Sequence, residues 1–438
     1  VDQDLGAIAL SPADATLTLS STPPGAGVTT NGTFTGLTPL TLALAPAAPH
    51  SLQISRAGYQ SQTLNVTLSR GQTARRTVDL VPELGEVRFA ILPANAELLI
   101  NGTAVGTGSQ TLSLPAVQQR VEVRLAGYAG YDTRVLPKPG LPQQVSVTLL
   151  TEAAARKAAM TPAITTPLGQ TLVLVDPSTE TQNPFVMGAS RRDPGRRSNE
   201  VEHPVELKRA FYIATTETTN AQFRQFEAIH DSGSIESYSL DRDHQPVAGI
   251  SWQQAASFCN WLSRREGLPP FYRENQGVIV GFNPSSTGYR LPSEAEWAFT
   301  ARVEGNQLRR FAWGDDFPPT QVVTNVADNT SALVTGRILN GYTDQFVVSA
   351  PVGSFPPNHR GLHDLGGNVA EWVHDGYQIP SANAELAIDP LGMQRGDNYT
   401  IRGGSWGLSR LSELRLTFRD YGERGRDDLG FRIARYAE

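Results

Sequence analysis

The sequence predicts a chain of several domains, in which two small all-β sandwiches are followed by a larger, irregular α+β domain. Three observations support this. The chain has 438 residues, which is too long for one ordinary hydrophobic core. Its 40 glycines and 30 prolines favour strands, turns and loops over long helices. A pattern of strand and turn signals occurs twice within residues 16–150, as tandem modules do.

The two N-terminal copies share their landmarks in the same order. The Asn-Gly pair at Asn31 recurs at Asn101, 70 residues later, and the Ala-Gly-Tyr at Ala57 recurs at Ala126, 69 residues later. Asn-Gly between two runs that alternate apolar and polar residues is a strong hairpin signal, because both central turn residues need positive φ. Each copy is therefore predicted to be a small β-sandwich, the first over residues 1–82 and the second over 83–150.

These two copies resemble the PEGA family. The Pro-Glu-Gly-Ala pattern of that family corresponds to Pro23-Pro24-Gly25-Ala26 and to Pro93-Ala94-Asn95-Ala96. The second copy has Asn95 in place of the glycine, and Asn also tolerates positive φ. PEGA modules resemble carbohydrate-binding sandwiches and are usually found in bacterial envelope proteins. The resemblance implies an extracytoplasmic spacer or adhesion role, and a plain spacer without a ligand is the simpler interpretation.

Residues 151–169 are predicted to link the sandwiches to a C-terminal domain that spans residues 170–438. The segment begins Ala-rich, as short helices do, and ends rich in Thr and Pro, as extended linkers do. Within the C-terminal domain, the sequence predicts helices that begin after Thr219, Ser251 and Ser293.

Two of these predicted helices carry apolar faces. Phe223, Phe226 and Ile229 recur at three-residue spacing after Thr219, and Cys259 follows Ser251 on an apolar face. The side chain of Cys259 is therefore expected to face the core as a small, inert hydrophobe.

Four segments of the C-terminal part carry a family resemblance. They are YIATTETTNAQFRQF, GYRLPSEAEWAFTAR with FAWGDD, GLHDLGGNVAEW, and IRGGSW followed by DLGFRIAR. Together they resemble the formylglycine-generating-enzyme family, also called the sulfatase-modifying-factor domain, over the predicted C-terminal domain. The resemblance implies an irregular α+β fold that is related to C-type lectin domains and has little regular secondary structure.

The resemblance also implies two calcium sites. The implied ligand sets are Asn325, the carbonyl of Val326, Asp344 and the carbonyl of Phe346 for the first site, and Asp364, the carbonyls of Gly367 and Val369, and Glu371 for the second. Calcium prefers such carboxylate, amide and carbonyl oxygens from flexible loops. An alternative without an ion stays open for the second set, because Asn368 and Glu371 have the spacing of a capping box that begins a short helix.

The catalytic residues of the family are absent. The enzymes carry two cysteines five residues apart, just after Arg-Gly-Gly-Ser, which bind copper and activate oxygen; the corresponding positions here hold Leu408 and Glu413. Neither side chain can replace a thiolate, which is needed to bind Cu(I) and to exchange with a substrate cysteine. We therefore expect a pseudoenzyme with calcium and with no copper or iron.

Other chemistry receives little support from the sequence. A branch of the fold binds non-haem iron through three histidines, partly from an extra N-terminal helical domain, but here the two sandwiches stand in that place. His359 and His363 are four residues apart in a Gly/Pro-rich loop, and a triad of Ser405, His363 and Asp364 stays open without a nucleophile-elbow pattern. The alternative function is a metal-dependent oxidoreductase of the same fold with ligands other than cysteine.

Composition restricts the partners and the compartment. The net charge of −6 and the absence of a Lys/Arg stripe argue against nucleic acid. A single cysteine excludes an internal disulfide, and without a run of 18 apolar residues we expect no membrane span. The chain begins at Val1, as a product with its signal segment removed would. We expect a periplasmic or cell-surface protein that binds an envelope protein or glycan within a larger assembly.

Overall fold

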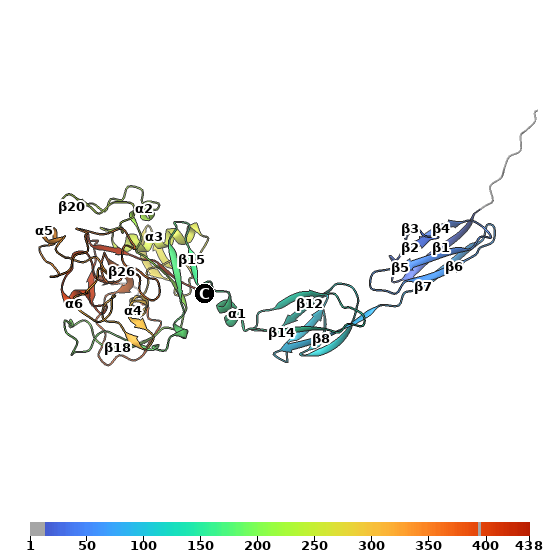
Figure 1. The fold of residues 1–438 in the computed structure, drawn as a ribbon, viewed down its shortest axis with the longest axis horizontal. Coiled ribbons are helices and arrows are strands. Elements are labelled where there is room, and N and C mark those ends of the chain that lie inside the picture. Colours follow the sequence, from blue (N-terminus) through green and yellow to red (C-terminus); the bar gives the residue numbers. More distant parts are fainter. Residues whose placement is uncertain (1–13, 393–395) are drawn as a thin grey trace, which may run out of the picture. The chain divides into compact units, whose positions relative to one another are not determined.

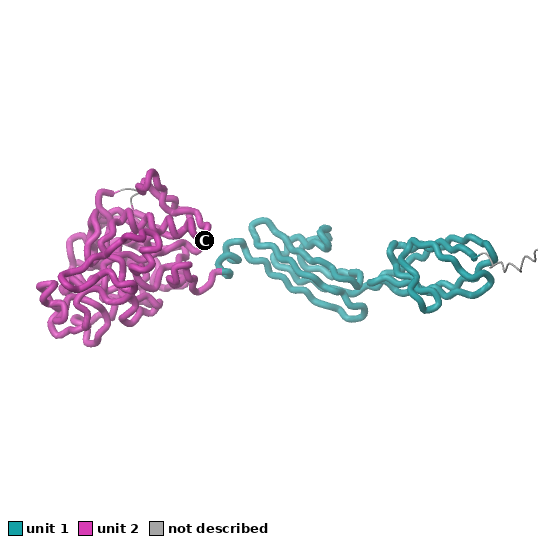
Figure 2. Tube along the Cα trace, turned by 90° about the horizontal axis from the view of Figure 1, so that it is seen from above, with its two compact units in different colours: residues 1–159 teal, residues 160–438 magenta. Residues whose placement is uncertain are grey.

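The structure, a computed structural model, describes residues 14–392 and 396–438. It divides the chain into two compact units, residues 1–159 and residues 160–438, which Figure 2 colours separately (Figures 1 and 2). In the described part of the chain, no helix has the length and apolar character needed to cross a membrane.

The first unit begins with a sandwich of two sheets. One sheet has the order β4-β1-β7 and the other the order β3-β2-β5-β6. The strands are β1 Ala15–Thr22, β2 Gly27–Thr30, β3 Thr33–Leu37, β4 Leu40–Leu44, β5 His50–Ser55, β6 Gln62–Val66 and β7 Thr73–Asp79. Strands β1 and β7 are parallel, and alternate side chains of the strands, such as Leu17, Leu19 and Val28, form an apolar core.

A second set of strands in the same unit repeats this arrangement. Its sheets have the orders β11-β8-β14 and β10-β9-β12-β13, which match the first set strand for strand. The strands are β8 Leu84–Leu92, β9 Glu97–Ile100, β10 Thr103–Thr107, β11 Gln110–Pro115, β12 Gln119–Arg124, β13 Tyr131–Val135 and β14 Gln143–Thr148. They enclose a separate apolar core that includes Val87, Phe89 and Leu98.

The two Asn-Gly pairs form the predicted hairpin turns. Asn31 and Gly32 have φ values of 50° and 87° between β2 and β3, and Asn101 and Gly102 have φ values of 52° and 80° between β9 and β10. Gly25 has a φ of 82°, whereas Asn95 at the corresponding position is not among the residues with positive φ, so the tolerance of Asn for that region is not needed there.

The predicted linker, residues 151–169, is only partly a linker. Its Ala-rich start forms helix α1, Glu152–Ala159, as predicted, and no residue of this helix is buried. Its Thr/Pro-rich end contains strand β15, Ala163–Thr165, which pairs with β16, Thr171–Val175. These residues therefore belong to a sheet of the second unit, because β-branched Ile164 and Thr165 suit a paired strand.

Short strands build most of the second unit. Its sheets have the orders β15-β16-β19-β31, β17-β18-β27 and β29-β28-β26-β30, and β20-β21, β22-β23 and β24-β25 form two-stranded pairs. The further bounds are β17 Phe185–Met187, β18 His203–Glu206, β19 Phe211–Ala214, β20 Ser234–Ile235, β21 Tyr238–Ser239, β22 Tyr272–Asn275, β23 Val278–Phe282, β24 Val303–Glu304, β25 Gln307–Leu308, β26 Ala370–Gly376, β27 Ala387–Ile388, β28 Tyr399–Arg402, β29 Arg419–Gly422, β30 Leu429–Phe431 and β31 Ala434–Tyr436.

Few helices accompany these strands. They are the 3-10 helix η1 Pro177–Thr179, α2 Asn220–Phe223, α3 Trp252–Arg265, α4 Glu294–Arg302, α5 Ala332–Thr335 and α6 Leu411–Leu414. The predicted helix starts at Ser251 and Ser293 are confirmed, since each serine caps its helix in a capping box.

The helix predicted after Thr219 is much shorter than its apolar spacing indicates. It ends at Phe223, and Ile229 is 92% exposed. The Phe223 and Phe226 rings both pack near Phe258 of α3, with centroid distances of 5.6 and 6.0 Å. This tertiary packing, and not a continued helix, determines the path of the chain.

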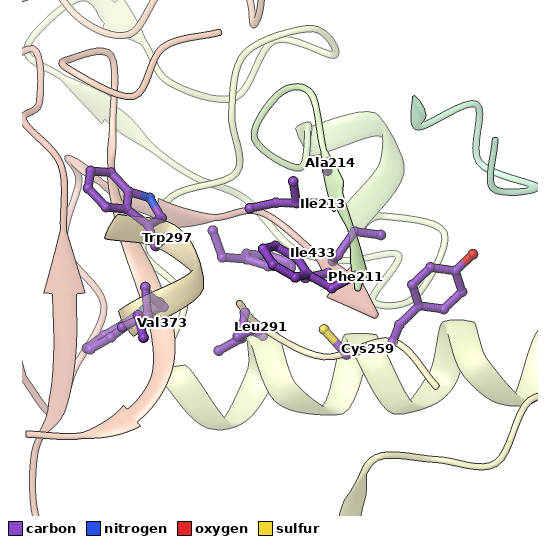
Figure 3. Close-up of a cluster of buried hydrophobic side chains, with 14 of the residues drawn as sticks. Phe211, Ile213, Ala214, Cys259, Leu291, Trp297, Val373 and Ile433 are labelled. Atoms are coloured by element: carbon purple, nitrogen blue, oxygen red, sulfur yellow. The ribbon is translucent and has the colours of Figure 1, made fainter. Parts of the chain in front are cut away.

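Cys259 lies in the core of the second unit, as predicted. Figure 3 shows its sulfur atom among apolar side chains that include Phe211, Leu291 and Ile433. Its side chain is fully buried, and burial raises the pKa of the thiol above its ordinary value. A thiol in this environment stays protonated and does not react as a nucleophile.

Loss of the α4 cap is expected to destabilise the second unit. The Ser293 hydroxyl accepts a hydrogen bond from the Glu296 backbone N–H at 3.1 Å, so Ser293→Ala should cost about 1 kcal/mol of unfolding free energy. Tryptophan fluorescence during urea unfolding reports on this unit, because all six tryptophans lie in it. The exposed Ser285→Ala is the control and should change less than about 0.5 kcal/mol. Equal effects of the two substitutions would contradict the capping role.

Candidate functional site

Strand β26 positions Glu371 at the centre of the second unit. The strand lies between antiparallel β28 and parallel β30, and all its residues are buried. The Glu371 carboxylate accepts hydrogen bonds from Trp297 Nε1 at 2.9 Å and from Arg432 Nε and Nη2 at 2.7 and 2.6 Å. The alternative of a capping box at Asn368 was wrong, because Asn368 has a φ of 63° and leads into a strand.

Two further buried carboxylates lie near the Arg432 guanidinium. Glu217 Oε1 accepts from Asn368 Nδ2 at 3.1 Å, and Asp364 Oδ2 accepts from the Gly353 N–H at 2.7 Å. The second oxygen of each carboxylate, Glu217 Oε2 and Asp364 Oδ1, is buried without a hydrogen-bond partner. The single positive charge of Arg432 is therefore shared among three carboxylates. One guanidinium cannot neutralise all three.

The pKa values of these carboxyls reflect that imbalance. Burial raises the pKa of Glu217 well above its ordinary value, and the neighbouring Asp364 raises it further, while Arg432 acts in the opposite direction. Burial also raises the pKa of Asp364. Such a pair either keeps a proton or gains from a bound cation. Sequence reasoning missed Glu217, although an acidic residue within the otherwise uncharged TTETTN was a visible signal.

The first predicted ligand set also has an unpartnered oxygen. Asn325 is fully buried, its Nδ2 donates to the Val348 carbonyl at 2.9 Å, and its Oδ1 has no hydrogen-bond partner. Asp344 accepts from the N–H groups of Val326 and Phe346 at 2.9 and 2.8 Å, so the structure brings these two other members of the set to the Asp344 carboxylate. Burial raises the pKa of Asp344 to about 7, and the nearby Asp328 adds to the effect.

Asn368 connects the two predicted ligand sets. Its side-chain oxygen accepts from Asn325 Nδ2 at 3.2 Å, and its Nδ2 donates to Glu217. Gly367, beside it, packs so closely that an added Cβ would lie 2.3 Å from the Asn325 carbonyl oxygen. Val369 continues this segment into an apolar cluster with Trp406. The loop before β26 is therefore tied on both sides to buried oxygen atoms.

The oxygen-rich composition of these sets fits calcium. Within the described ranges, no three His, Cys, Asp or Glu side chains are arranged to hold a metal ion. A cation at either set would therefore need amide and backbone oxygens as well as carboxylates, and calcium accepts such mixed oxygen ligands. The unpartnered oxygens of Asn325, Glu217 and Asp364 are available for that purpose, whereas both Glu371 oxygens already accept hydrogen bonds.

The two positions that hold cysteines in the enzymes do not fit copper. Leu408 packs against an apolar cluster that includes Phe311 and Leu414. Glu413, which is buried, pairs with Arg197 at 3.3 Å and with Arg337 at 3.8 Å. An aliphatic side chain and a carboxylate engaged by arginines offer no soft ligand.

The Arg-Gly-Gly segment that begins at Arg402 is fixed in the core by hydrogen bonds and close packing. Arg402 donates to Glu294 at 2.8 Å and to the Leu416 carbonyl at 2.6 Å, within the buried core. At Gly404 an added Cβ would lie 2.6 Å from the Gly366 carbonyl oxygen. The segment thus packs directly on the loop that precedes β26, which requires a glycine there.

The structure does not form the Ser405, His363 and Asp364 triad, so that hypothesis was wrong. The Ser405 hydroxyl donates to Asp428 at 2.7 Å, and the His363 ring bonds the Phe355 carbonyl at 2.7 Å through Nδ1. His359 lies near Glu304 instead, with its Nδ1 at 3.8 Å from the carboxylate. The two histidines therefore have separate partners and are not arranged as a metal pair.

Two family models match the chain. Residues 169–437 match the sulfatase-modifying factor enzyme 1-like domain, and residues 15–84 match the PEGA domain. Both matches fall on regions where the sequence showed the same resemblance. The second sandwich has the strand order of the first, and its membership of the PEGA family stays a prediction.

Known proteins resemble the C-terminal part. The formylglycine-generating enzyme of Mus musculus is 31% identical over 219 residues, which are 45% of this chain and 57% of the mouse protein. A second mouse protein, named inactive C-alpha-formylglycine-generating enzyme 2, is 31% identical over 198 residues, 43% of this chain and 48% of that protein. The chain spans about half the length of the curated relatives it matches.

One solved structure shares the fold. Treponema denticola variable protein 1 superposes with a TM-score of 0.51, at 23% sequence identity, over 63% of this chain and 99% of that one. At this identity the likeness concerns the fold alone. The predicted relation to C-type lectin domains stays a prediction.

Removal of the Glu371 carboxylate is expected to destabilise the second unit strongly. Glu371→Ala leaves the fully buried Arg432 guanidinium without its bidentate partner and should cost about 3–5 kcal/mol of unfolding free energy. Glu206→Ala, which removes an ion pair with the exposed Lys208, is the control and should cost less than about 1 kcal/mol. Urea unfolding, followed by tryptophan fluorescence, measures the unfolding free energy of both variants. Similar costs would show that the buried pair stabilises the unit no more than the exposed pair does.

Proposed function

The chain belongs to the sulfatase-modifying factor enzyme 1-like domain family through residues 169–437, and from this premise we propose that it uses the family's fold for binding, without the family's cysteine chemistry. In this proposal it is a non-catalytic binding or scaffold protein of the bacterial cell envelope. Its fold is stabilised by calcium, and its partner is an envelope protein or glycan within a larger assembly.

The observation that carries this proposal is the chemistry at the two cysteine positions. Leu408 lies against an apolar cluster, and Glu413 is engaged by Arg197 and Arg337. The chain's one cysteine is buried in α3 and cannot reach a substrate. A mouse relative that is named as inactive supports the idea that members of this family persist without activity.

The proposed envelope location draws on the N-terminal modules. The PEGA match at residues 15–84, followed by a second sandwich of the same strand order, supports a spacer that holds the C-terminal domain away from an anchoring point. Because PEGA modules are usually found in bacterial envelope proteins, the proposal places such a spacer in the periplasm or at the cell surface.

Calcium has a structural role in the proposal. Asn325, Val326, Asp344 and Phe346 would hold one ion, and Asp364, Gly367, Val369 and Glu371 would hold the other, with the charge of the nearby Glu217 adding to the attraction for it. The support is the set of buried oxygens without hydrogen-bond partners and the raised pKa values of Asp344, Glu217 and Asp364. Divalent ions would neutralise these carboxylates and fix the loops that carry them.

Glu217→Gln is expected to distinguish a bound calcium ion from a shared proton. The glutamine amide can still accept from Asn368 and can donate to Asp364, which interacts with the Glu217 side chain. In chelator, the Tm of the variant should equal or exceed that of the wild type. In calcium, the wild-type Tm should rise by about 4 °C or more, and the variant should gain clearly less.

The pH dependence of these proteins gives a second readout. The folded-state pKa of Glu217 is raised above the unfolded value, so in chelator the contribution of this group to stability is fully present below about pH 4.3 and is lost as the pH rises toward the folded-state pKa. Glu217→Gln should lose less over the same range, because the amide does not titrate. If calcium leaves the wild-type Tm unchanged, the calcium part of the proposal is wrong and the acid pair shares a proton.

Partner capture from envelope fractions tests the binding role. The full chain, immobilised in calcium, should retain a defined partner that mass spectrometry or glycan analysis identifies, and chelator should weaken retention at least about tenfold if calcium shapes the surface. Retention should survive in Cys259→Ser, which removes the thiol of the chain. Oxidation of a cysteine peptide by the wild type that persists in that variant would support instead the oxidoreductase alternative with ligands other than cysteine.

A further inference from the structure

A cavity of about 320 Å³ opens in the second unit, and its lining includes neither Leu408 nor Glu413. The segment that follows α4 forms one wall, with Glu304, Arg309 and Trp313. The rest of the lining includes residues 356–359 and also Leu362, Asp364, Leu365 and Gly366. This volume lies at the small end of the range of ligand sites, so it suits one small molecule or the end of a chain molecule and does not suit a folded surface.

Trp313 gives the cavity a rigid aromatic wall. Its ring stacks on Phe311 with a centroid distance of 5.1 Å and an interplanar angle of 8°, and Phe311 stacks in turn on Phe317 at 5.5 Å. The Trp313 Nε1–H donates to the Asp316 carbonyl at 2.9 Å, so the polar group of the ring is already satisfied. The half-buried indole therefore presents ring surface, which favours contact with C–H groups.

Close packing at Gly366, which also lines the cavity, fixes the position of Trp313. At Gly366 an added Cβ would lie 2.7 Å from the Ala312 Cβ and 3.4 Å from the Trp313 ring. The loop before β26 therefore packs directly against the Trp313 segment, and the same loop carries the oxygens of the second proposed calcium set. A cavity held in this way is formed before a ligand arrives.

The polar side chains that line the cavity carry charges of both signs. Glu304 pairs with Arg309 at 2.6 Å, and Arg309 holds the pKa of Glu304 below its ordinary value, so both are ionised at neutral pH. His359 lies 3.8 Å from the same carboxylate. An anionic ligand would meet the carboxylates of Glu304 and Asp364, and a cationic one would meet Arg309. Neutral ligands with many hydroxyl groups can instead accept from the arginine and donate to the carboxylate.

We propose that this cavity is a carbohydrate-binding site that takes one or two sugar residues at the end of a neutral glycan. The C–H face of a sugar ring packs on Trp313, and its hydroxyls bond the Glu304 and Arg309 pair beside it. The inference rests on the proposed binding function and deepens it, because it assigns the partner class to glycans and places the contact in this cavity.

Calorimetric titration of the full chain in calcium tests this assignment. The probes are cellobiose, maltose, lactose and N,N′-diacetylchitobiose, with glucuronic acid and glucosamine as charged comparators. At least one neutral disaccharide is expected to bind saturably, with a Kd below about 10 mM. Trp313→Ala should weaken that binding at least tenfold, and His359→Ala at the exposed rim should weaken it severalfold. Tyr421→Ala is the matched control, since Tyr421 is an exposed aromatic residue that does not line the cavity.

Several results would overturn the assignment. Absence of saturable binding of every neutral probe would do so, as would equal affinity of Trp313→Ala and the wild type or a preference for the charged sugars. The urea unfolding midpoints of Trp313→Ala and His359→Ala must both equal that of the control. If Trp313→Ala is unfolded, the affinity of His359→Ala for the disaccharide tests the assignment. If the wild type retains a protein partner but binds no sugar, the assignment of the cavity to glycans is wrong and the proposed binding function stands.

Discussion

The second unit depends on the buried ion pair between Glu371 and Arg432. The arginine is fully buried and donates to both carboxylate oxygens, and it also donates to the carbonyls of Ala214 and His363. It thereby joins β26, the end of β19 and the loop that precedes β26 at one point. Because the elements are short and irregular, few backbone ladders could align these segments otherwise. A buried guanidinium without its carboxylate partner is costly, which favours the packing in which these segments meet.

Other arginines repeat this role across the unit. Arg290 forms a bidentate pair with Glu296, Arg402 and Arg419 share Glu294, and Arg415 bonds Glu200, all with buried side chains. These pairs give a physical reason for the composition, in which only three lysines occur. A planar guanidinium can bond carboxylates and several carbonyls at once, whereas an ammonium group offers a point charge. Loops without regular hydrogen bonding thus obtain buried donors for their carbonyl groups.

The same network shows that the frame around the two cysteine positions of the family does not depend on cysteines. Arg402 begins the segment that leads to the cysteine positions, yet its partners are Glu294 and the Leu416 carbonyl, which lie in the core. Leu408 and Glu413 therefore do not disturb this frame, and Glu413 has arginine partners of its own. In the proposed function, surfaces around this frame bind the partner, and the cavity beside Trp313 is one such surface.

Sequence reasoning reached the parts of the structure that local signals determine. The Asn-Gly turns, the serine caps of α3 and α4 and the burial of Cys259 follow from spacing and turn chemistry. The extent of the helix after Thr219 could not be predicted, because ring packing against Phe258 overrides its periodicity. The role of β15 depends on pairing with a strand of the second unit. Glu217 escaped because its partners, Asn368 and Asp364, lie about 150 residues away in sequence and meet it only in the fold.

Metal analysis of the purified full chain tests the central claim most directly. The protein is dialysed against a mixture of calcium, copper and iron salts, freed of loosely bound metal and measured by inductively coupled plasma mass spectrometry. The account predicts calcium near two equivalents per chain, reduced to about one in Glu217→Gln, with copper and iron far below one equivalent. Copper or iron at one equivalent, retained by Cys259→Ser, would contradict the account and favour a redox enzyme with ligands other than cysteine.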